Sequence, residues 1–284
     1  MKRMTLEEIN NLIPELHSVQ LDLLLKMDSI CRKHNIKYYL AFGSCIGAVR
    51  HNGFIPWDHD IDVLMSIDDV ERFEKYANDE KYKILTWKNG SNFNSIAPWF
   101  INADTTCVIE ENVNLDIDQS VAIDIYPFYN APKSKLALKA NILRAHLYTL
   151  LVLGTPPQNH GKIVKNLGRL ILKYYGSRRI TKALKLEKKL RSVPYSGKIL
   201  DYFGLDISLF NAITYPFEWF GEPKDIEFEG HMVMGPADPD KYLRKRYGDY
   251  MRIPPKEEQI SNLSNYVYLD VNKGYHGKWI NDFK

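Results

Sequence analysis

Two aspartates that lie two positions apart, Asp60 and Asp62, have the spacing in this sequence that most clearly predicts chemistry. They alternate with Ile61 and Val63, which is typical of a β-strand with one polar and one apolar face. Side chains at positions i and i+2 point to the same side of a strand, so the two carboxylates should converge. Like charges on one face are costly unless a cation neutralises them, and Mg²⁺ or Mn²⁺ accepts oxygen ligands. The pair therefore predicts a divalent metal site that handles phosphate groups.

A glycine and a serine, Gly43 and Ser44, precede these aspartates and follow a predicted strand over 37–42. Glycine allows the backbone to approach a ligand, and a helix that begins at Ser44 would direct its N–H groups and positive dipole end toward a phosphate. Asp124 lies in an apolar strand predicted over 120–128, where an unpaired carboxylate is costly. We expect Asp124 to be a third metal ligand or the base that deprotonates an acceptor hydroxyl. A salt-bridged core aspartate is the structural alternative.

The remaining pattern predicts a mixed α/β fold, with a mixed sheet of the α+β kind, that positions these residues. Thr5 and Glu8 form a capping box at the start of an N-terminal helical region, which Pro14 restarts or kinks and which continues to Lys33. Asp238 and Pro239 begin a helix that Gly248 ends. The other predicted elements are strands over 61–65, 83–87, 98–102 and 106–110, helices over 135–152, 162–175 and 179–191, and a hairpin over 226–234.

Charge is distributed unevenly along the 284 residues, although the net charge is only +3. The segment 133–198 holds 16 Lys and Arg and a single acidic residue, Glu187, so its net charge is +15. We therefore divide the chain into a catalytic core over 1–132, a basic helical insertion over 133–198 and a C-terminal part over 199–284 that packs back on the core. A segment this basic attracts polyanions or anionic lipid, whereas a solvated helical surface is the structural alternative.

The cysteines and the apolar segments indicate a cytoplasmic protein. Cys31, Cys45 and Cys107 are odd in number and lack metal-ligand spacing, so we expect reduced thiols. The first ten residues contain no apolar region typical of a signal peptide. The longest apolar run, 147–153, is shorter than the roughly 20 residues that span a bilayer.

Several blocks of the sequence resemble the LicD family of phosphotransferases. The longest begins at Asn35 and includes GSCIGAVRHNGFIPWDHDIDVLM over 43–65, and shorter ones lie at 124–127, 241–243 and 247–251. Bacterial members of this family transfer phosphocholine from CDP-choline to teichoic acids or surface glycans, and fukutin-type ribitol-phosphate transferases are similar in the same block. The resemblance implies a nucleotidyltransferase-like core with a small mixed sheet flanked by helices.

By motif position, the resemblance assigns roles to individual residues. Donor phosphate is bound at Gly43 and Ser44, and the metal at Asp60, Asp62 and Asp124. Arg50 is available to clamp phosphate, with a structural ion pair as the alternative. A choline head group requires an aromatic cage, for which the candidates near the motifs are Tyr38, Trp57 and Tyr126, although aromatic residues in strands are commonly core residues.

Two residues depart from the family pattern. His59 stands where the family usually has an aspartate, and we expect its side chain to point away from Asp58 and Asp60. The family also has a histidine soon after the block at 247–251, whereas the next candidate in this chain is His276.

The expected function is metal-dependent transfer of a phospho-head group, phosphocholine foremost, from a CDP-activated donor to a hydroxyl of teichoic acid or a lipid-linked glycan, with release of CMP. The basic insertion favours an anionic, lipid-linked acceptor and peripheral attachment to the inner face of the cell membrane. Nucleic acid is not an expected partner, because the basic residues lack interleaved aromatic side chains. Two alternatives remain: a nucleotidyltransferase that attacks the α-phosphate and releases pyrophosphate, and an inactive scaffold that binds a polyanion or a membrane.

Overall fold

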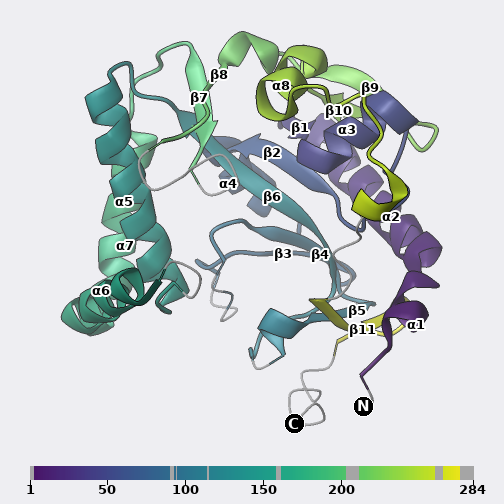
Figure 1. The fold of residues 1–284 in the computed structure, drawn as a ribbon, viewed down its shortest axis with the longest axis horizontal. Helices are drawn as coiled ribbons and strands as arrows, with labels where there is room; N and C mark the ends of the chain where they lie inside the picture. Colours follow the sequence, from purple (N-terminus) through teal and green to yellow (C-terminus); the bar gives the residue numbers. More distant parts are fainter. Residues whose placement is uncertain are drawn as a thin grey trace. The chain divides into compact units, whose positions relative to one another are not determined.

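The computed structural model describes residues 3–89, 93, 95–113, 115–157, 161–202, 211–259 and 265–275 (Figure 1). The chain forms two compact units. The first comprises Met1–Phe93, Pro98–Ile125 and Trp219–Lys284, and the second comprises Asn94–Ala97 and Tyr126–Glu218. The predicted mixed α/β class is confirmed, because both helices and a mixed sheet are present.

Five strands of a seven-stranded sheet lie at the centre of the first unit, although one of them continues into the second unit. Their order is β1 (Tyr38–Leu40), β2 (Asp62–Ser66), β6 (Val121–Asn130), β4 (Trp99–Asn102) and β3 (Tyr82–Leu85) (Figure 1). Strand β1 pairs antiparallel with β2, and β4 pairs antiparallel with both β3 and β6. The sheet therefore places the start of β2 beside the middle of β6, where Asp62 and Asp124 lie.

The N-terminal helices and the helix that Asp238 and Pro239 begin agree with the predicted starts and ends. Both hydrogen bonds of the capping box form, since each of the side chains of Thr5 and Glu8 accepts from the backbone N–H of the other residue. Pro14 lies in the first turn of the second helix. Pro14 thus starts a new helix rather than kinking one, because proline lacks the N–H that an interior turn requires. The five helices described in this unit are α1 (Leu6–Asn10), α2 (Ile13–Lys33), α3 (Phe42–His51), α4 (Ile67–Glu74) and α8 (Pro239–Tyr247).

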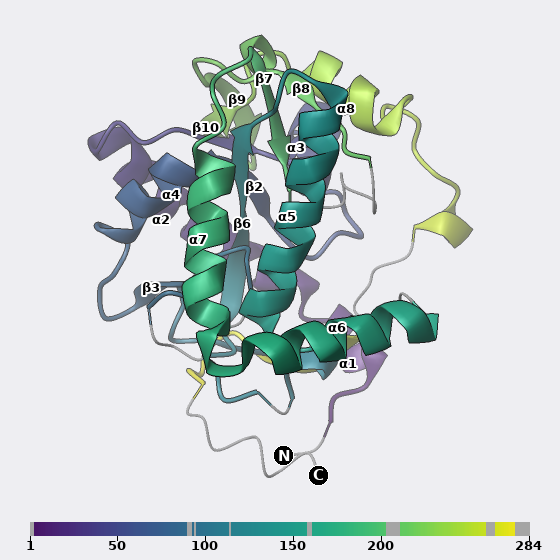
Figure 2. The same ribbon diagram turned by 90° about the vertical axis from the view of Figure 1, so that its left-hand side faces the viewer.

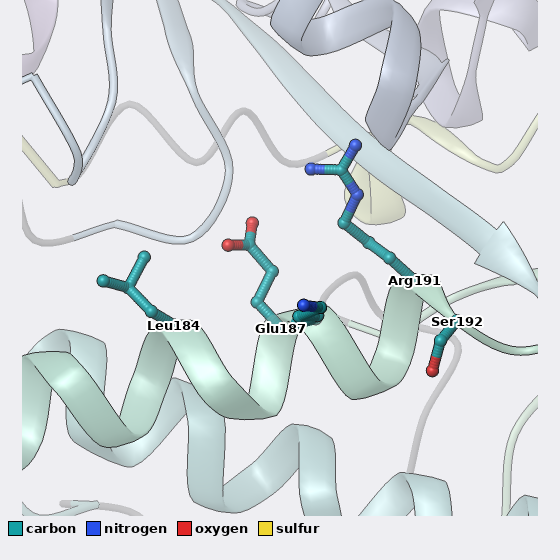
Figure 3. Close-up of a pocket in the computed structure, with 5 residues that line it drawn as sticks. Leu184, Glu187, Arg191 and Ser192 are labelled. Carbon is teal, nitrogen blue, oxygen red and sulfur yellow. The ribbon is translucent and has the colours of Figure 1, made fainter.

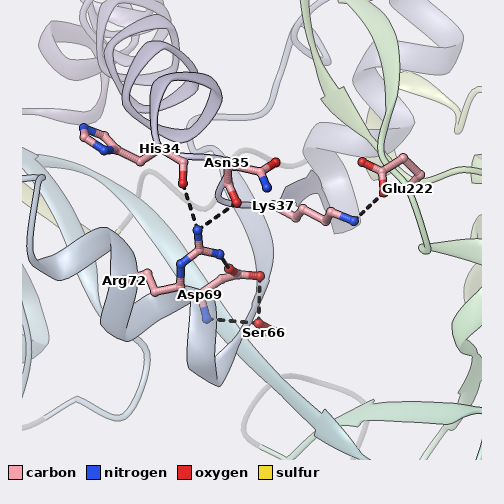
Figure 4. Close-up of polar contacts among 7 residues, drawn as sticks. All are labelled: His34, Asn35, Lys37, Ser66, Asp69, Arg72 and Glu222. Atoms are coloured by element: carbon pink, nitrogen blue, oxygen red, sulfur yellow. Dashed lines mark hydrogen bonds and ion pairs between the residues drawn. The ribbon is translucent and has the colours of Figure 1, made fainter.

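A polar network fixes α4 directly after β2 (Figure 4). Ser66 caps α4, because its hydroxyl accepts a hydrogen bond of 3.0 Å from the Asp69 N–H. The Arg72 guanidinium pairs with Asp69 at 2.7 Å and also donates to the carbonyl oxygens of His34 and Asn35, which follow the end of α2. The network therefore links both ends of the β1–β2 region to helices and holds the strand that carries Asp62.

Two small antiparallel pairs complete the first unit. The predicted hairpin is confirmed: β9 (Lys224–Phe228) pairs with β10 (His231–Gly235), with Glu229 and Gly230 at positive φ in the turn. Strand β5 (Thr106–Ile109) pairs with β11 (Tyr266–Asp270), which was not predicted.

The described part of the second unit contains three α-helices and the C-terminal half of β6. This half pairs with β7 (Lys198–Asp201), which in turn pairs with β8 (Tyr215–Pro216). The three helices predicted within the insertion 133–198 are confirmed as α5 (Lys135–Leu153), α6 (Gly161–Tyr175) and α7 (Arg179–Arg191). Helix α7 packs along α5, and α6 lies across the ends of both helices (Figure 2).

Helix α5 is longer than the apolar run 147–153 that was noted in the sequence, and it is apolar over most of its length. Within the described ranges, it is the one helix that meets the length and composition of a membrane span, with a mean hydropathy of 1.3 over 18 residues. The core helix of a soluble protein meets the same criterion. Helix α5 buries Ile142, Ala145 and Tyr148, among others, so part of its apolar surface packs inside the second unit.

An acidic cluster at the start of helix α3

Helix α3 begins next to the aspartates, as the sequence predicts, but two residues earlier than expected. Ala41 is extended and its N–H donates to the Asp62 carbonyl at 3.0 Å, so the entry to the helix is attached to β2. Phe42 has a φ of 47°, which is strained for a phenylalanine, and its N–H donates to the Tyr242 hydroxyl at 3.2 Å. The start of α3 is thus fixed by contacts with β2 and α8.

Gly43 is required because the carboxylate of Asp58 lies against it. A Cβ atom at position 43 would stand 2.4 Å from Oδ2 of Asp58, closer than any real contact. The Asp58 carboxylate therefore lies at the positive end of α3, where negative charge is favoured. The Asp58 carbonyl contacts Nε2 of His17 at 2.8 Å, which helps to fix the loop before β2.

Ser44 holds the backbone of one of the aspartates. Its buried hydroxyl accepts a hydrogen bond of 2.9 Å from the Asp62 N–H. Strand β2 begins at Asp62, so Asp60 precedes the strand instead of occupying its predicted face. Ile61 and Val63 are fully buried, as predicted. The N–H of Asp124 donates to the Ile61 carbonyl at 3.0 Å, which places the third predicted carboxylate on the neighbouring strand.

Four carboxylates influence one another in this cluster, which we call the acidic cluster: Asp58, Asp60, Asp62 and Asp124. All four are half-buried. Burial and the charge of Asp60 raise the pKa of Asp58 to about 7, and the same two causes raise the pKa of Asp124 to about 7. Burial and the charges of Asp60 and Asp124 raise the pKa of Asp62 well above its usual value. Loss of all four protons is therefore unfavourable without a counter-ion.

The donor chemistry of the acidic cluster fits a hard divalent cation. Carboxylate oxygens are the ligands that Mg²⁺ and Mn²⁺ prefer, and the crowding of charge is the electrostatic problem that such an ion relieves. Across the described ranges, no three His, Cys, Asp or Glu side chains already stand in the arrangement of a metal site. The fit accordingly rests on charge and ligand type, not on preformed coordination.

Arg246 is the cation whose charge opposes the rise in the pKa of Asp62, and the sequence prediction did not include it. It projects from α8, with its guanidinium carbon 4.3 Å from the centre of the Phe42 ring and 5.1 Å from that of Tyr247. Its position directly before the block 247–251, which resembles the LicD family, is the signal that could have identified it. Arg246 thus places a positive charge beside both the acidic cluster and the start of α3.

Arg50, the predicted phosphate clamp, lies in the last turn of α3. Its guanidinium donates to the carbonyl oxygens of Tyr250 at 2.7 Å and Arg252 at 3.1 Å. These bonds attach the segment after α8 to the end of α3. The geometry favours the structural alternative for Arg50, although through backbone carbonyls and not through an ion pair.

His59 lies between the aspartates in sequence and packs against an element from far along the chain. Its ring is edge-on to Tyr266 of β11 at 5.2 Å, and its carbonyl accepts a hydrogen bond of 2.8 Å from Gln20. Burial lowers the pKa of His59, while the charge of Asp60 acts in the opposite direction. His276, the other histidine in question, lies outside the described residues.

The three aromatic candidates for a head-group site lie in different surroundings. Tyr38 is fully buried and its hydroxyl donates to Asp28 at 2.8 Å, so its ring presents no surface to a ligand. Trp57 is half-buried, with its ring edge-on to His51 at 6.0 Å. Tyr126 is half-buried and belongs to the second unit. Of the candidates in the first unit, Trp57 is the one that is not fully buried, and the guanidinium carbon of Arg50 lies 6.0 Å from the centre of its ring.

A pocket of about 490 Å³ lies on α7 in the second unit (Figure 3). It contains none of the residues predicted to carry chemistry. Glu187, the single acidic residue of the basic segment, is buried in its wall beside Arg191. The residues that line it are Leu184, Glu187, Lys188, Arg191 and Ser192.

Comparison with known proteins relates the first unit and part of the second to one family. Residues 35–146 match the model of the LicD/FKTN/FKRP nucleotidyltransferase domain, and this range contains the whole acidic cluster. The chain is 26% identical to the lipopolysaccharide cholinephosphotransferase LicD of Haemophilus influenzae over 95% of its own length and all of that protein. A segment of 50 residues is 40% identical to the human ribitol 5-phosphate transferase FKRP and covers 10% of it. The predicted resemblance is therefore confirmed: this chain resembles the LicD family of phosphotransferases.

Proposed function

We propose that this protein is a phosphotransferase that modifies cell-surface glycans and that phosphocholine is the group it transfers. The proposed donor is CDP-choline, and the proposed acceptor is a hydroxyl of teichoic acid or of another anionic, lipid-linked glycan. Similarity along the whole length of the Haemophilus influenzae cholinephosphotransferase supports this choice of head group. The similarity to the human ribitol 5-phosphate transferase covers a much shorter segment.

The observation that carries the proposal is the acidic cluster beside the start of α3 and Arg246. A substrate that contains a pyrophosphate requires hydrogen-bond donors and cations that contact its oxygens, and also a way to balance the charge that moves during transfer. The first N–H groups of α3 and the Arg246 guanidinium would supply the hydrogen bonds and the positive charge. Gly43 leaves room for the Asp58 carboxylate at this end of the helix, since a Cβ atom there would stand 2.4 Å from its Oδ2.

Asp60, Asp62 and Asp124 would hold a divalent cation, Mg²⁺ or Mn²⁺. When bound, such an ion neutralises phosphate oxygens and stabilises the charge that develops on the leaving group. Ser44 would keep Asp62 in place through the hydrogen bond to its backbone. Trp57 is the aromatic candidate of the first unit that would contact a quaternary ammonium, because it is half-buried whereas Tyr38 is fully buried.

The proposed reaction is a single in-line displacement. The oxygen of the acceptor hydroxyl forms a bond to the phosphorus of phosphocholine, and the bond from that phosphorus to the CMP oxygen breaks. CMP leaves with the bonding electron pair, and the hydroxyl proton passes to a carboxylate. Asp58, which is not among the proposed ligands of the cation, is suited to accept it, because a pKa of about 7 matches proton transfer near neutral pH.

A donor panel tests the proposal directly. Purified protein with Mg²⁺ and an anionic glycan acceptor is supplied with CDP-choline, CDP-glycerol, CDP-ribitol or CDP-ethanolamine, and the release of CMP is measured. CMP release that is fastest with CDP-choline and requires both metal and acceptor supports the proposal. Absence of CMP release from all four donors contradicts it, and a preference for another donor refutes the choice of phosphocholine.

A nucleotidyltransferase reaction is the second candidate, because the matching domain is described as a nucleotidyltransferase domain. In that reaction the acceptor attacks the α-phosphate of a nucleoside triphosphate and pyrophosphate leaves. Incubation with CTP and acceptor, followed by measurement of pyrophosphate, distinguishes the two reactions. Release of pyrophosphate without turnover of any CDP-alcohol favours this candidate.

A further inference from the structure

Helix α6 of the second unit carries large apolar side chains on its exposed surface. Ile163 is 84% exposed, Leu167 55%, Leu170 65% and Tyr174 71%. Their spacing of 4, 3 and 4 residues places them in one row along the helix. We call these four side chains the apolar row.

A second row of side chains runs beside the apolar row, one residue earlier at each position. Lys162, Asn166, Arg169 and Lys173 are all exposed and have the same spacing, and the Arg169 guanidinium donates to Asn166 at 3.3 Å. We call this the basic row. Since successive residues are rotated by about 100° in a helix, the two rows lie on adjacent faces.

The remaining face of α6 is the one that packs. Gly168 is the buried residue of the helix, and a Cβ atom there would stand 3.0 Å from Pro157 and 3.6 Å from Leu150. Gly168 is therefore the point at which α6 approaches α5 and its following linker. The apolar row lies away from this contact, so the folding of the second unit does not explain why it is apolar.

We propose that α6 is a docking element for the surface of a bilayer that contains anionic lipid. The apolar row would enter the boundary between head groups and acyl chains, and the basic row would remain at the level of the anionic head groups. Each Lys or Arg near such a surface strengthens binding by about fivefold. The paired rows therefore predict a preference for anionic over neutral vesicles, which an apolar face alone does not predict.

The arrangement of the rows favours a membrane over a second copy of the chain. If two α6 helices met through their apolar rows, their basic rows would border the same interface and repel each other. A bilayer offers apolar depth and negative charge together. The inference depends only on α6, so it can hold or fail independently of the proposed transfer reaction.

Vesicle sedimentation without donor or acceptor tests this inference. The full-length protein is mixed with vesicles of 70% phosphatidylcholine and 30% phosphatidylglycerol, or of phosphatidylcholine alone. We expect at least tenfold stronger binding to the anionic vesicles, which weakens between 50 and 500 mM salt. Leu167→Ser with Leu170→Ser should reduce binding at least tenfold, and Arg169→Gln with Lys173→Gln should remove most of the anionic preference.

Met232 provides the matched control, because it is similarly exposed, 57%, but lies on β10 of the first unit. Met232→Ser should leave vesicle binding unchanged. Circular dichroism of each variant should match the parent, since none of the substituted side chains is buried. Equal binding by the parent and the Leu167/Leu170 variant overturns the proposal. Light scattering that shows a dimer, lost in that variant, with no vesicle binding by the parent, instead assigns the apolar row to a second copy.

Discussion

The acidic cluster of the first unit and the basic row of the second unit use charge in opposite ways. In the acidic cluster, four half-buried carboxylates crowd together, and burial raises the pKa of three of them. In the basic row, three exposed cations lie along one helix. Buried charge interacts strongly at short range, whereas exposed charge is screened but attracts over a distance. The first arrangement suits chemistry at one point, and the second suits attachment to an extended surface.

This contrast predicts that a single substitution in the acidic cluster abolishes activity. Asp62→Asn should reduce the rate of CMP release on the order of a thousandfold, because it removes a charge that acts on the transferring group. The variant should fold as well as the parent, since it relieves repulsion among carboxylates. Asp104→Asn, which changes an exposed aspartate of the first unit, is the control and should retain full activity. Activity of Asp62→Asn within tenfold of the parent contradicts the assignment.

A change beside the acidic cluster should act through one specific carboxylate. Gly43→Ala introduces a Cβ atom that the Asp58 carboxylate must leave, so we expect a loss of about a hundredfold in kcat/KM and about 1–3 kcal/mol in unfolding free energy. The effects of Gly43→Ala and Asp58→Ala should not be additive. In a protein that already carries Asp58→Ala, Gly43→Ala should reduce kcat/KM less than fivefold. Full additivity in this cycle would show that Gly43 acts by another route.

Substitutions of Arg246 and Arg50 should have different effects, the first on catalysis with the donor and the second on the stability of the fold. Arg246→Gln should reduce kcat/KM for the donor by about 10- to 50-fold with little change in the thermal midpoint, because its charge lies beside the acidic cluster. Arg50→Gln should instead lower the thermal midpoint by several degrees, since it loses hydrogen bonds to two carbonyls. Steady-state kinetics and a melting curve of each variant provide the comparison. The reverse pattern would return the phosphate role to Arg50.

The last expected effect concerns the dependence of stability on pH in the absence of metal. Asp58 and Asp124 have a pKa of about 7 in the folded chain against an ordinary 3.8. A raised pKa contributes stability that is present below 3.8 and is lost as pH rises through about 7, so the thermal midpoint of chelator-treated protein should fall over this range. Mg²⁺ at 100 times its Kd should restore about 2.7 kcal/mol at pH 7 and less at pH 5. A midpoint that rises with pH after chelation contradicts the repulsion we describe.

Local patterns were sufficient to predict most of the helices and strands. The spacing of apolar residues predicted α7 to the residue, and the Asp238-Pro239 pair with Gly248 bounded α8. Strands β7, β8 and β11 were missed, and two of them, β7 and β11, pair with strands far away in sequence. Such pairing leaves little trace in local sequence.

The candidate site was predicted only in part for the same reason. Asp60, Asp62 and Asp124 were found from their alternation with apolar residues, and the domain match contains all three. The contact between Gly43 and Asp58 depends on how the loop before β2 folds back on α3. Arg246 comes from a helix nearly 200 residues after Phe42, and only the fold brings them within 4.3 Å. The roles of these residues stay predictions until the variants are measured.

The first unit is interrupted in sequence, and this has a consequence for its synthesis. The four aspartates emerge from the ribosome with the first half of the chain, but Arg246 follows only after the whole of the second unit. At roughly 5–20 residues per second, the nascent acidic cluster waits about 6–24 s for that arginine. During this interval the chain lacks the arginine whose charge opposes the rise in the pKa of Asp62. Magnesium in the translation mixture should therefore influence the yield of folded protein, separately from any influence on catalysis.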